Sequence, residues 1–455
     1  LEVARAGHPP AGGSTDPRRL TSAGDLAHAP LAAATKPPRA APSQQAMLRR
    51  LLPLLGLLAC RPAATPPATP TTPGLTPTAF TAQQRAWFDL RKRASAAMAA
   101  EDFQGAADLT REALAASPDH PGLRYTLARA LALAGEKDAA FAALDALAGY
   151  AQTFPIDQDP ALASLQGDPR LPALVARFAA AAAPIQIAEL RPAATVDIPT
   201  FLPECAEPDP RTGDLYLSSV HERRILRVRA DGRRDDLVPP AGHGLWSVLG
   251  LRLDPARNLL WATTTASATT RDLQNADAGQ SALLAFRLED GAVAARHLLA
   301  EPGVPHDLGD LALLPNGAIV VSDNVAGMLH VLDAPDAALR PLVPAGTFAS
   351  PQGVVADDTG NRLYLADYAL GLHALDLTDP AAPTIHPLAA PAHASLRGID
   401  GLDRARRSLV ASQNGVAPAR VLRIDLDAGG LAIDAVLTRP AARPTFAPQT
   451  PVRGA

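Results

Sequence analysis

Five times after residue 200, the chain repeats a short hydrophobic strand, a polar turn and a second hydrophobic strand. The second strands begin at residues 215, 260, 319, 363 and 409, so successive copies are 45, 59, 44 and 46 residues apart. A four-stranded propeller blade takes about 40 to 50 residues. This spacing predicts an all-β propeller with about five blades present.

The turns before these second strands use the same few residue types. Asp, Pro, Asn and Gly recur in Asp209 to Gly213, Asp254 to Asn258, Leu314 to Gly317 and Asp357 to Asn361. These residue types favour tight hairpins, because they adopt the required backbone angles or bond back to the turn. A third strand follows in every copy, as expected for a meander.

Two segments carry a resemblance to a known superfamily. They are Ser350 to Val354 with Leu363 to Tyr368, and Arg397 to Leu402 with Gln413 to Gly415. Both resemble the six-bladed superfamily that includes gluconolactonase, the senescence marker protein, strictosidine synthase and NHL-repeat proteins. The resemblance implies a six-bladed type of propeller over residues 186–446.

Only five copies of the repeat are present, although the superfamily has six blades. After the fifth copy, residues 447–455 show no strand alternation and contain Pro448 and Pro451. We therefore expect an irregular tail there, truncated or shifted in frame. Residues 186–199 are expected to supply one or two outer strands of a closing blade.

The repeat predicts where a ligand would bind. If each innermost strand runs along the channel and the next strand returns, the start of the first and the end of the second meet at one rim. The predicted ligand-binding residues at this rim are Asp310, Asp323, Asp367, Asn414 and His306. The alternative is that such aspartates only accept backbone hydrogen bonds in turns.

The resemblance also implies a metal site. In metal-dependent lactonases of the superfamily, oxygen ligands hold a divalent cation that polarises a carbonyl. The matching positions are Glu204, Gln352 and Asp400, and the implied cation is calcium or zinc. Leu249, the counterpart of Glu204 in the second copy, cannot ligate. No catalytic residue is identified.

Residues 82–184 follow a different, helical period that is rich in alanine. A 34-residue self-match relates Leu90 to Pro118 with Arg124 to Leu147, which resembles the tetratricopeptide repeat. This predicts an N-terminal all-α repeat whose concave surface binds a protein or peptide. The alternative is a purely structural support for the propeller.

The first 80 residues predict processing and anchoring rather than a folded domain. Residues 1–46 precede the first methionine and are expected to be an untranslated or disordered leader. Residues 47–60 pair two arginines with a short apolar run that ends at Cys60, which resembles a bacterial lipoprotein signal with Cys60 as the lipidated residue. Residues 61–80 form a linker rich in Pro, Thr and Ala. This predicts a periplasm-facing envelope protein that meets the membrane only through its lipid anchor.

These observations predict a multidomain protein and leave two functions open. The formal charge of −4 gives no basic field for nucleic acid. The preferred interpretation is a protein- or ligand-binding scaffold, with a small molecule at the propeller rim. The alternative is a divalent-metal-dependent lactone or ester hydrolase at the same rim. Whether the protein is an enzyme therefore stays open, and a non-catalytic role is preferred.

Overall fold

The computed structural model describes residues 82–181, 194–301 and 303–440, all within one compact unit. The predicted leader, the signal segment with Cys60, the linker and the tail lie outside these residues. In the part of the chain that is described, no helix combines the length and apolar character needed to cross a membrane.

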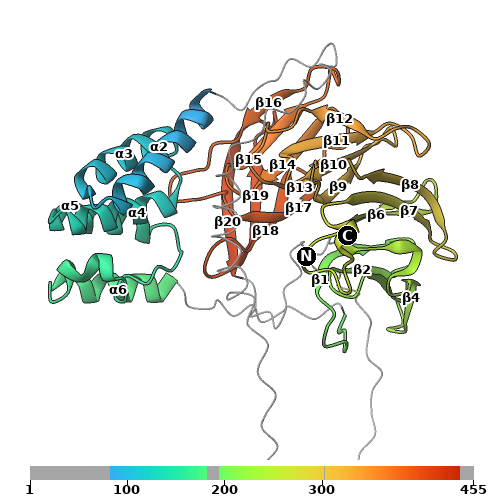
Figure 1. The fold of residues 1–455 in the computed structure, drawn as a ribbon, viewed down its shortest axis with the longest axis horizontal. Coiled ribbons are helices and arrows are strands. Elements are labelled where there is room, and N and C mark those ends of the chain that lie inside the picture. The colour runs from blue at the N-terminus through green and yellow to red at the C-terminus, as the bar shows by residue number, and fades with distance from the viewer. Residues whose placement is uncertain (1–81, 182–193, 302, 441–455) are drawn as a thin grey trace, which may run out of the picture. The chain divides into compact units, whose positions relative to one another are not determined.

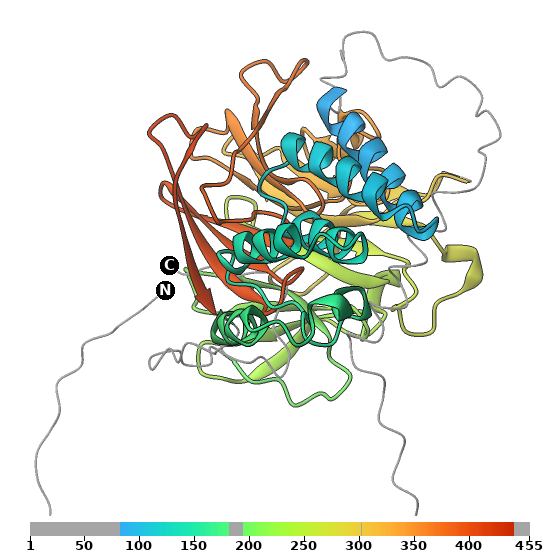
Figure 2. The same cartoon turned by 90° about the vertical axis from the view of Figure 1, so that its left-hand side faces the viewer.

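The N-terminal part of the described chain is helical. Its elements are α2 (Ala82–Ala99), α3 (Phe103–Ala116), α4 (Pro121–Leu133), α5 (Lys137–Ala148), the short 3-10 helix η1 (Pro160–Leu165) and α6 (Arg170–Ala181). Successive α helices from α2 to α5 pack against one another, as Figure 2 shows. The starts of α3 and α5 are 34 residues apart, which is the repeat length of the sequence self-match.

Local sequence explains where the helices begin. The Asp102 carboxylate accepts the backbone N–H of Gly105 at 3.0 Å at the start of α3. The His120 imidazole accepts the N–H of Leu123 at 3.2 Å at the start of α4, where Pro121 occupies the first turn. Both are capping bonds to amides that lack a partner within the helix.

Small residues let these helices approach closely. Ala106, Ala107, Ala128 and Ala140 are fully buried, and Leu144 and Leu147 fill the space between them. Such an interface of small side chains is typical of stacked helical repeats. The expected all-α repeat is therefore present.

The rest of the described chain forms five antiparallel sheets of four strands each, shown in Figure 1. Blade 1 is β1 (Pro203–Pro208), β2 (Leu215–Ser219), β3 (Arg224–Val228) and β4 (Arg234–Val238). Blade 2 is β5 (Ser247–Asp254), β6 (Leu259–Thr265), β7 (Ser281–Arg287) and β8 (Val293–Leu299). Blade 3 is β9 (Leu308–Leu313), β10 (Ile319–Asp323), β11 (Met328–Leu332) and β12 (Arg340–Val343). Blade 4 is β13 (Pro351–Ala356), β14 (Arg362–Asp367), β15 (Gly371–Asp376) and β16 (Thr384–Pro387). Blade 5 is β17 (Ile399–Ala405), β18 (Ser408–Gln413), β19 (Arg420–Leu426) and β20 (Ile433–Pro440).

Each sheet follows chain order, so every blade is a four-stranded meander. The first strands of consecutive blades lie side by side, in the order β1, β5, β9, β13 and β17, and apolar clusters fill the spaces between sheets. The prediction of about five blades after a helical repeat is confirmed.

The described residues do not show a sixth blade. Strand β17 does not pack along β1 in the way that the other inner strands pack along their neighbours, within the residues that are placed. Residues 194–199 form no strand, so this part of the segment expected to supply outer strands does not do so, while residues 186–193 lie outside the described chain.

Helical and β residues of this compact unit also contact each other. Arg420 on β19 donates from Nη1 to the carbonyl oxygens of Tyr150 and Ala151, both at 3.2 Å. Arg397 lies over the Trp87 ring at 5.1 Å from its centroid and pairs with Asp119 at 3.7 Å. The helices are therefore joined to blade 5 by the buried Arg420, and to the loop before it by the partly buried Arg397.

Candidate functional site: the acidic mouth of the channel

The innermost strands share an irregularity that brings equivalent residues to one end of the channel. In blades 1, 2, 3 and 5, a hydroxyl on the second strand accepts a backbone N–H from the first strand. The pairs are Cys205 with Ser218, Gly250 with Thr263, Asp310 with Ser322 and Gly401 with Ser412, at 2.8 to 3.0 Å. Each pair lies at a register shift between the two strands.

The residues just before these amides are structural equivalents. They are Glu204, Leu249, Gly309 and Asp400, with Gln352 at the matching register position in blade 4. The sequence comparison of Leu249 with Glu204 thus agrees with the register. Glu204, Gln352 and Asp400 are each partly exposed, whereas the residue after each of them is buried.

Glu204 and Asp400 lie near two further carboxylates. Burial raises the pKa of Glu204 well above its usual range, and the charges of Asp400, Asp307 and Asp310 raise it further. Burial also raises the pKa of Asp400 to about 7; a hydrogen bond from Asn414 opposes this shift and Asp310 adds to it. Carboxylates from blades 1, 3 and 5 therefore lie close enough to interact, and we call the group formed by Glu204, Asp307, Asp310 and Asp400 the mouth.

Asp307 was not among the predicted site residues, although it precedes strand β9 directly. Burial raises its pKa to about 6, with hydrogen bonds from Thr265 and Asn324 opposing the shift and Asp323 adding to it. Its Oδ1 atom and the Oδ1 atom of Asn324 are buried and have no hydrogen-bond partner among the described residues. Unpartnered acceptor oxygens next to several carboxylates are suited to a cation.

A second layer lies further along the same strands. The buried Arg252 guanidinium is 3.7 Å from Glu207 Oε2 and 3.8 Å from Asp310 Oδ1. Burial raises the pKa of Asp310 to about 6, and the Arg252 charge opposes this shift. Burial raises the pKa of Asp403 to about 6 in the same surroundings.

The two layers are rich in carboxyl groups. They contain those of Glu204, Glu207, Asp307, Asp310, Asp400 and Asp403, and the charge of Arg252 lowers the pKa of Glu207, Asp310 and Asp403. Like charges in a poorly hydrated site stay ionised only with compensation, so this mouth either holds protons or attracts a cation.

Other predicted rim residues bind within the protein. Gln352 donates from Nε2 to Ser350 Oγ at 3.1 Å, and Asn414 donates from Nδ2 to Asp400 Oδ2 at 2.5 Å. Asp367 accepts four backbone N–H groups, from Ala349, Ser350, Ala369 and Leu370. Both carboxylate oxygens of Asp367 therefore hold backbone turns, and the Gln352 side chain is directed to Ser350.

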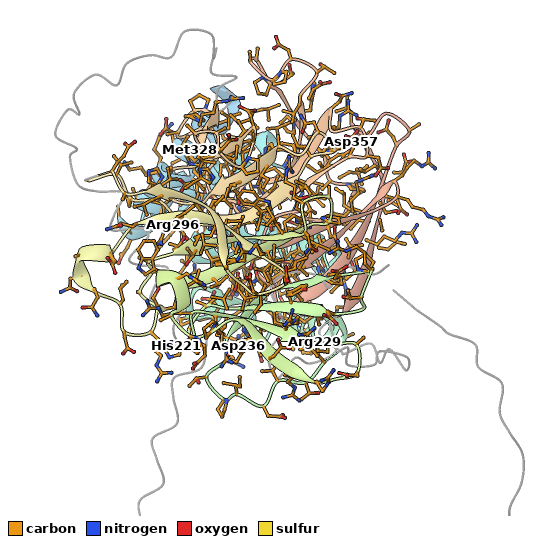
Figure 3. The ribbon with its side chains drawn as sticks, turned by 90° about the vertical axis from the view of Figure 1, so that its right-hand side faces the viewer. His221, Arg229, Asp236, Arg296, Met328 and Asp357 are labelled. Carbon is orange, nitrogen blue, oxygen red and sulfur yellow. The ribbon has the colours of Figure 1, made fainter. Side chains whose placement is uncertain are left out.

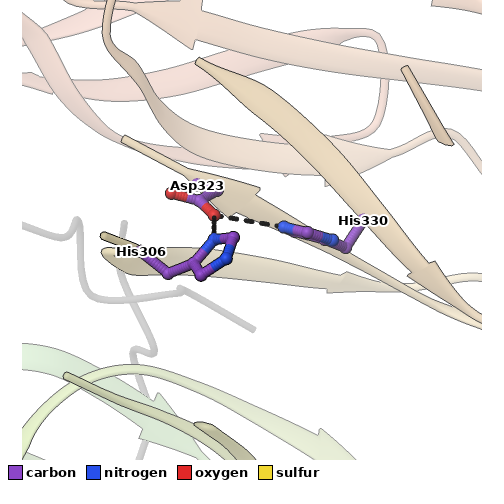
Figure 4. Close-up of side chains that lie close together, drawn as sticks. All are labelled: His306, Asp323 and His330. Carbon is purple, nitrogen blue, oxygen red and sulfur yellow. Dashed lines mark hydrogen bonds and ion pairs between the residues drawn. The ribbon is translucent and has the colours of Figure 1, made fainter. Parts of the chain in front are cut away.

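Asp323 and His306 meet in blade 3, together with His330, as Figure 4 shows. His306 Nδ1 is 2.6 Å from Asp323 Oδ2, and His330 Nε2 is 3.1 Å from the same oxygen. His330 was not predicted. The sequence feature that could have identified it is a histidine within an otherwise apolar strand, and the same feature recurs at His373 in the next blade.

A polar cavity of about 420 Å³ lies on blades 1 and 2, and its arginines are already paired. Arg211 pairs with Asp209 at 2.8 Å, and Arg229, labelled in Figure 3, pairs with Asp235 at 2.8 Å. None of the mouth carboxylates lines this cavity. We therefore place the candidate site at the mouth rather than here.

Residues 97–168 match the tetratricopeptide repeat family. No curated protein sequence matches the chain. Among solved structures, a gluconolactonase from Xanthomonas campestris is 18% identical, with a TM-score of 0.39, over 54% of this chain and 77% of that chain. The calcium-binding protein regucalcin from Agrobacterium tumefaciens is 15% identical, with a TM-score of 0.39, over 52% and 75%. Virginiamycin B lyase from Staphylococcus aureus is 12% identical, with a TM-score of 0.38, over 54% and 72%.

Proposed function

We propose that this protein is a binding module whose propeller mouth holds a divalent cation and, through it, an oxygen-bearing small molecule. The observation that supports this most directly is the mutual repulsion of carboxyl groups from blades 1, 3 and 5, which adds to burial in raising the pKa values of Glu204 and Asp400. A divalent cation would offset their repulsion and bind Asp307 Oδ1, which has no hydrogen-bond partner in the described part of the chain.

The donor set favours calcium over zinc at this position. Glu204, Asp307, Asp400 and the amides nearby offer oxygen atoms, and calcium takes six to eight oxygen ligands in flexible geometries. Zinc prefers nitrogen and sulfur donors in tetrahedral sites. The remaining coordination positions would be filled by water or by the small molecule.

The test is a calcium titration of the full chain followed by thermal melting. A ligand at 100 times its Kd adds about 2.7 kcal/mol to the free energy of unfolding. Glu204→Gln should abolish the calcium-dependent rise in Tm. Asp434→Asn, which changes an exposed aspartate on β20, should retain it. A wild-type Tm that calcium leaves unchanged would refute the cation site.

A second candidate function is hydrolysis of a lactone or ester at the same mouth. It is favoured by Asp400, because a carboxyl group with a pKa of about 7 can exchange protons near neutral pH. A bound divalent cation would polarise the carbonyl of such a substrate. The test is turnover of a panel of sugar lactones, and turnover that is lost in Asp400→Asn would establish this function. If the protein turns over none of them, hydrolysis is refuted for this class of substrate and binding remains the proposed function.

The helical repeat is proposed to bind a protein or peptide partner. The match to the tetratricopeptide repeat family supports a role in protein interaction in general. A pull-down with the full chain and with a chain lacking residues 82–181 would test this proposal. Partners retained equally by both would refute it.

We also propose that the protein is a lipid-anchored component of a bacterial envelope, facing the periplasm. The support is the segment that ends at Cys60, followed by a proline-rich tether. Expression in a Gram-negative host with labelled palmitate should label the wild type and leave Cys60→Ser unlabelled. An unlabelled wild type would refute the anchor.

A further inference from the structure

A second potential metal site lies inside blade 3 and does not involve Glu204 or Asp400. It consists of His306 in the loop before β9, Asp323 at the end of β10 and His330 on β11. All three side chains are buried, and one ligand atom from each lies within 4.8 Å of the others. Among the residues that the structure describes, no other group of this kind is found.

The two oxygen atoms of the Asp323 carboxylate bind different kinds of partner. Its Oδ1 atom accepts the backbone N–H groups of Asp307 and Ala326, both at 3.1 Å. Among the described residues, its Oδ2 atom is bonded by two imidazoles, His306 Nδ1 at 2.6 Å and His330 Nε2 at 3.1 Å. The backbone thus fixes the carboxylate while one oxygen points between two nitrogen donors.

Blade 4 shows what a purely structural version of this position looks like. In the strand pairing, Asp367 lies opposite Gly371, as Asp323 lies opposite Met328. His373 then follows Gly371 along β15 in the same way that His330 follows Met328 along β11. Asp367 uses both oxygens for backbone N–H groups. Turn formation therefore does not require the two imidazoles that surround Asp323.

An independent feature also points to a ligand. His306 Nε2 is buried and has no hydrogen-bond partner among the described residues. Because no hydrogen bond among the described residues fixes the protonation of Nε2, this nitrogen can carry the ring proton when Nδ1 binds an ion. A buried nitrogen lone pair without a partner is unfavourable in the protein alone.

We propose that His306, Asp323 and His330 bind a transition-metal ion of the zinc class, separately from the calcium site at the mouth. Two imidazoles and one carboxylate suit zinc, cobalt or nickel, at bond lengths of about 2.0 to 2.2 Å. The ion takes the lone pairs of His306 Nδ1 and His330 Nε2, so in each neutral imidazole the proton resides on the other ring nitrogen. The ligand atoms must separate slightly, because donors about 2.1 Å from one ion lie more than 3 Å apart.

The experiment uses the full chain freed of metal and titrated with Co²⁺, which gives visible absorption in a site with nitrogen ligands. We expect one tight site with this absorption, displaced by Zn²⁺. His306→Ala and His330→Gln should each weaken Co²⁺ binding at least tenfold. His373→Gln is the matched control in blade 4 and should leave binding unchanged.

Two further measurements make the result decisive. Asp400→Asn should keep the Co²⁺ site, so failure of the mouth proposal and failure of this one are distinguishable. If a histidine variant does not fold, ¹⁵N-histidine NMR of the wild type should show two imidazoles shifting when Zn²⁺ is added. No Co²⁺ absorption, no shifted imidazole, or equal loss in His373→Gln would each overturn the proposal.

Discussion

Thr263 Oγ1 in blade 2 donates a hydrogen bond to the carbonyl oxygen of Gly309 in blade 3 at 2.5 Å, while accepting the N–H of Gly250 in its own blade at 2.8 Å. Ser218 does the same one blade earlier, donating to Leu249 at 2.7 Å. One hydroxyl thus joins two strands of its own blade to the inner strand of the next. These bridges hold the inner strands in the register that creates the acidic mouth.

Thr263→Val should therefore destabilise the propeller. Valine keeps the shape but leaves the Gly250 N–H and the Gly309 carbonyl without their buried partner, which costs about 1 to 3 kcal/mol. Urea unfolding would measure the loss. Thr263→Ser is the control, because it retains the hydroxyl and should recover most of the stability. Equal losses in both variants would show that packing, not the hydrogen bond, matters at this position.

The raised pKa values of the mouth carboxyls predict how stability depends on pH. A carboxyl whose pKa is higher in the folded state binds more protons there, so stability falls as pH rises from its usual range to its folded pKa. Asp307, Asp310 and Asp403 have pKa values raised to about 6, and Asp400 to about 7. In the presence of EDTA, Tm should be higher at pH 5 than at pH 8.

Asp400→Asn tests this directly, since asparagine can still accept the Asn414 hydrogen bond but carries no charge. The variant should melt at a higher temperature than the wild type at pH 8 and show a flatter profile between pH 5 and pH 8. A profile that rises with pH in the wild type would contradict the assignment of these carboxyls to one repelling cluster.

Asp307→Asn should weaken calcium binding without unfolding the protein. The substitution removes one negative charge beside Glu204 but keeps the size of the side chain. We expect the calcium Kd to rise about tenfold or more, which corresponds to at least about 1.4 kcal/mol. Isothermal titration calorimetry would measure it, with Asp434→Asn as the control. An unchanged Kd would place the ion elsewhere.

Arg420→Met should loosen the contact between the helices and blade 5. Methionine fills much of the same space but leaves the Tyr150 and Ala151 carbonyls without their donor. Hydrogen exchange at residues 150–153 should become faster, and the free energy of unfolding should fall by about 1 to 3 kcal/mol. Arg423→Met, on the same strand but largely exposed, should change neither quantity by much.

Local sequence determined the blades and the helical repeat. Turn residues bound each of the five second strands, the first of which begins at Leu215 and the last at Leu409. Side chains alternate between the two faces of each strand, which places apolar groups in the spaces between sheets. The 34-residue spacing predicted the repeat that α3 and α5 show. These features depend on neighbours within a few tens of residues, so they can be read from the chain alone.

Tertiary structure alone decided which polar groups meet. Glu204 and Asp400 are almost 200 residues apart, and their interaction depends on how far the ring of blades curves. Asp323 and Asp367 look alike in sequence, yet one carboxylate is bonded by two imidazoles and the other has both oxygens bonded by backbone amides. The reason is physical: hydrogen bonding and charge repulsion depend on distances of a few ångströms, and across blades only the packing of whole sheets sets those distances.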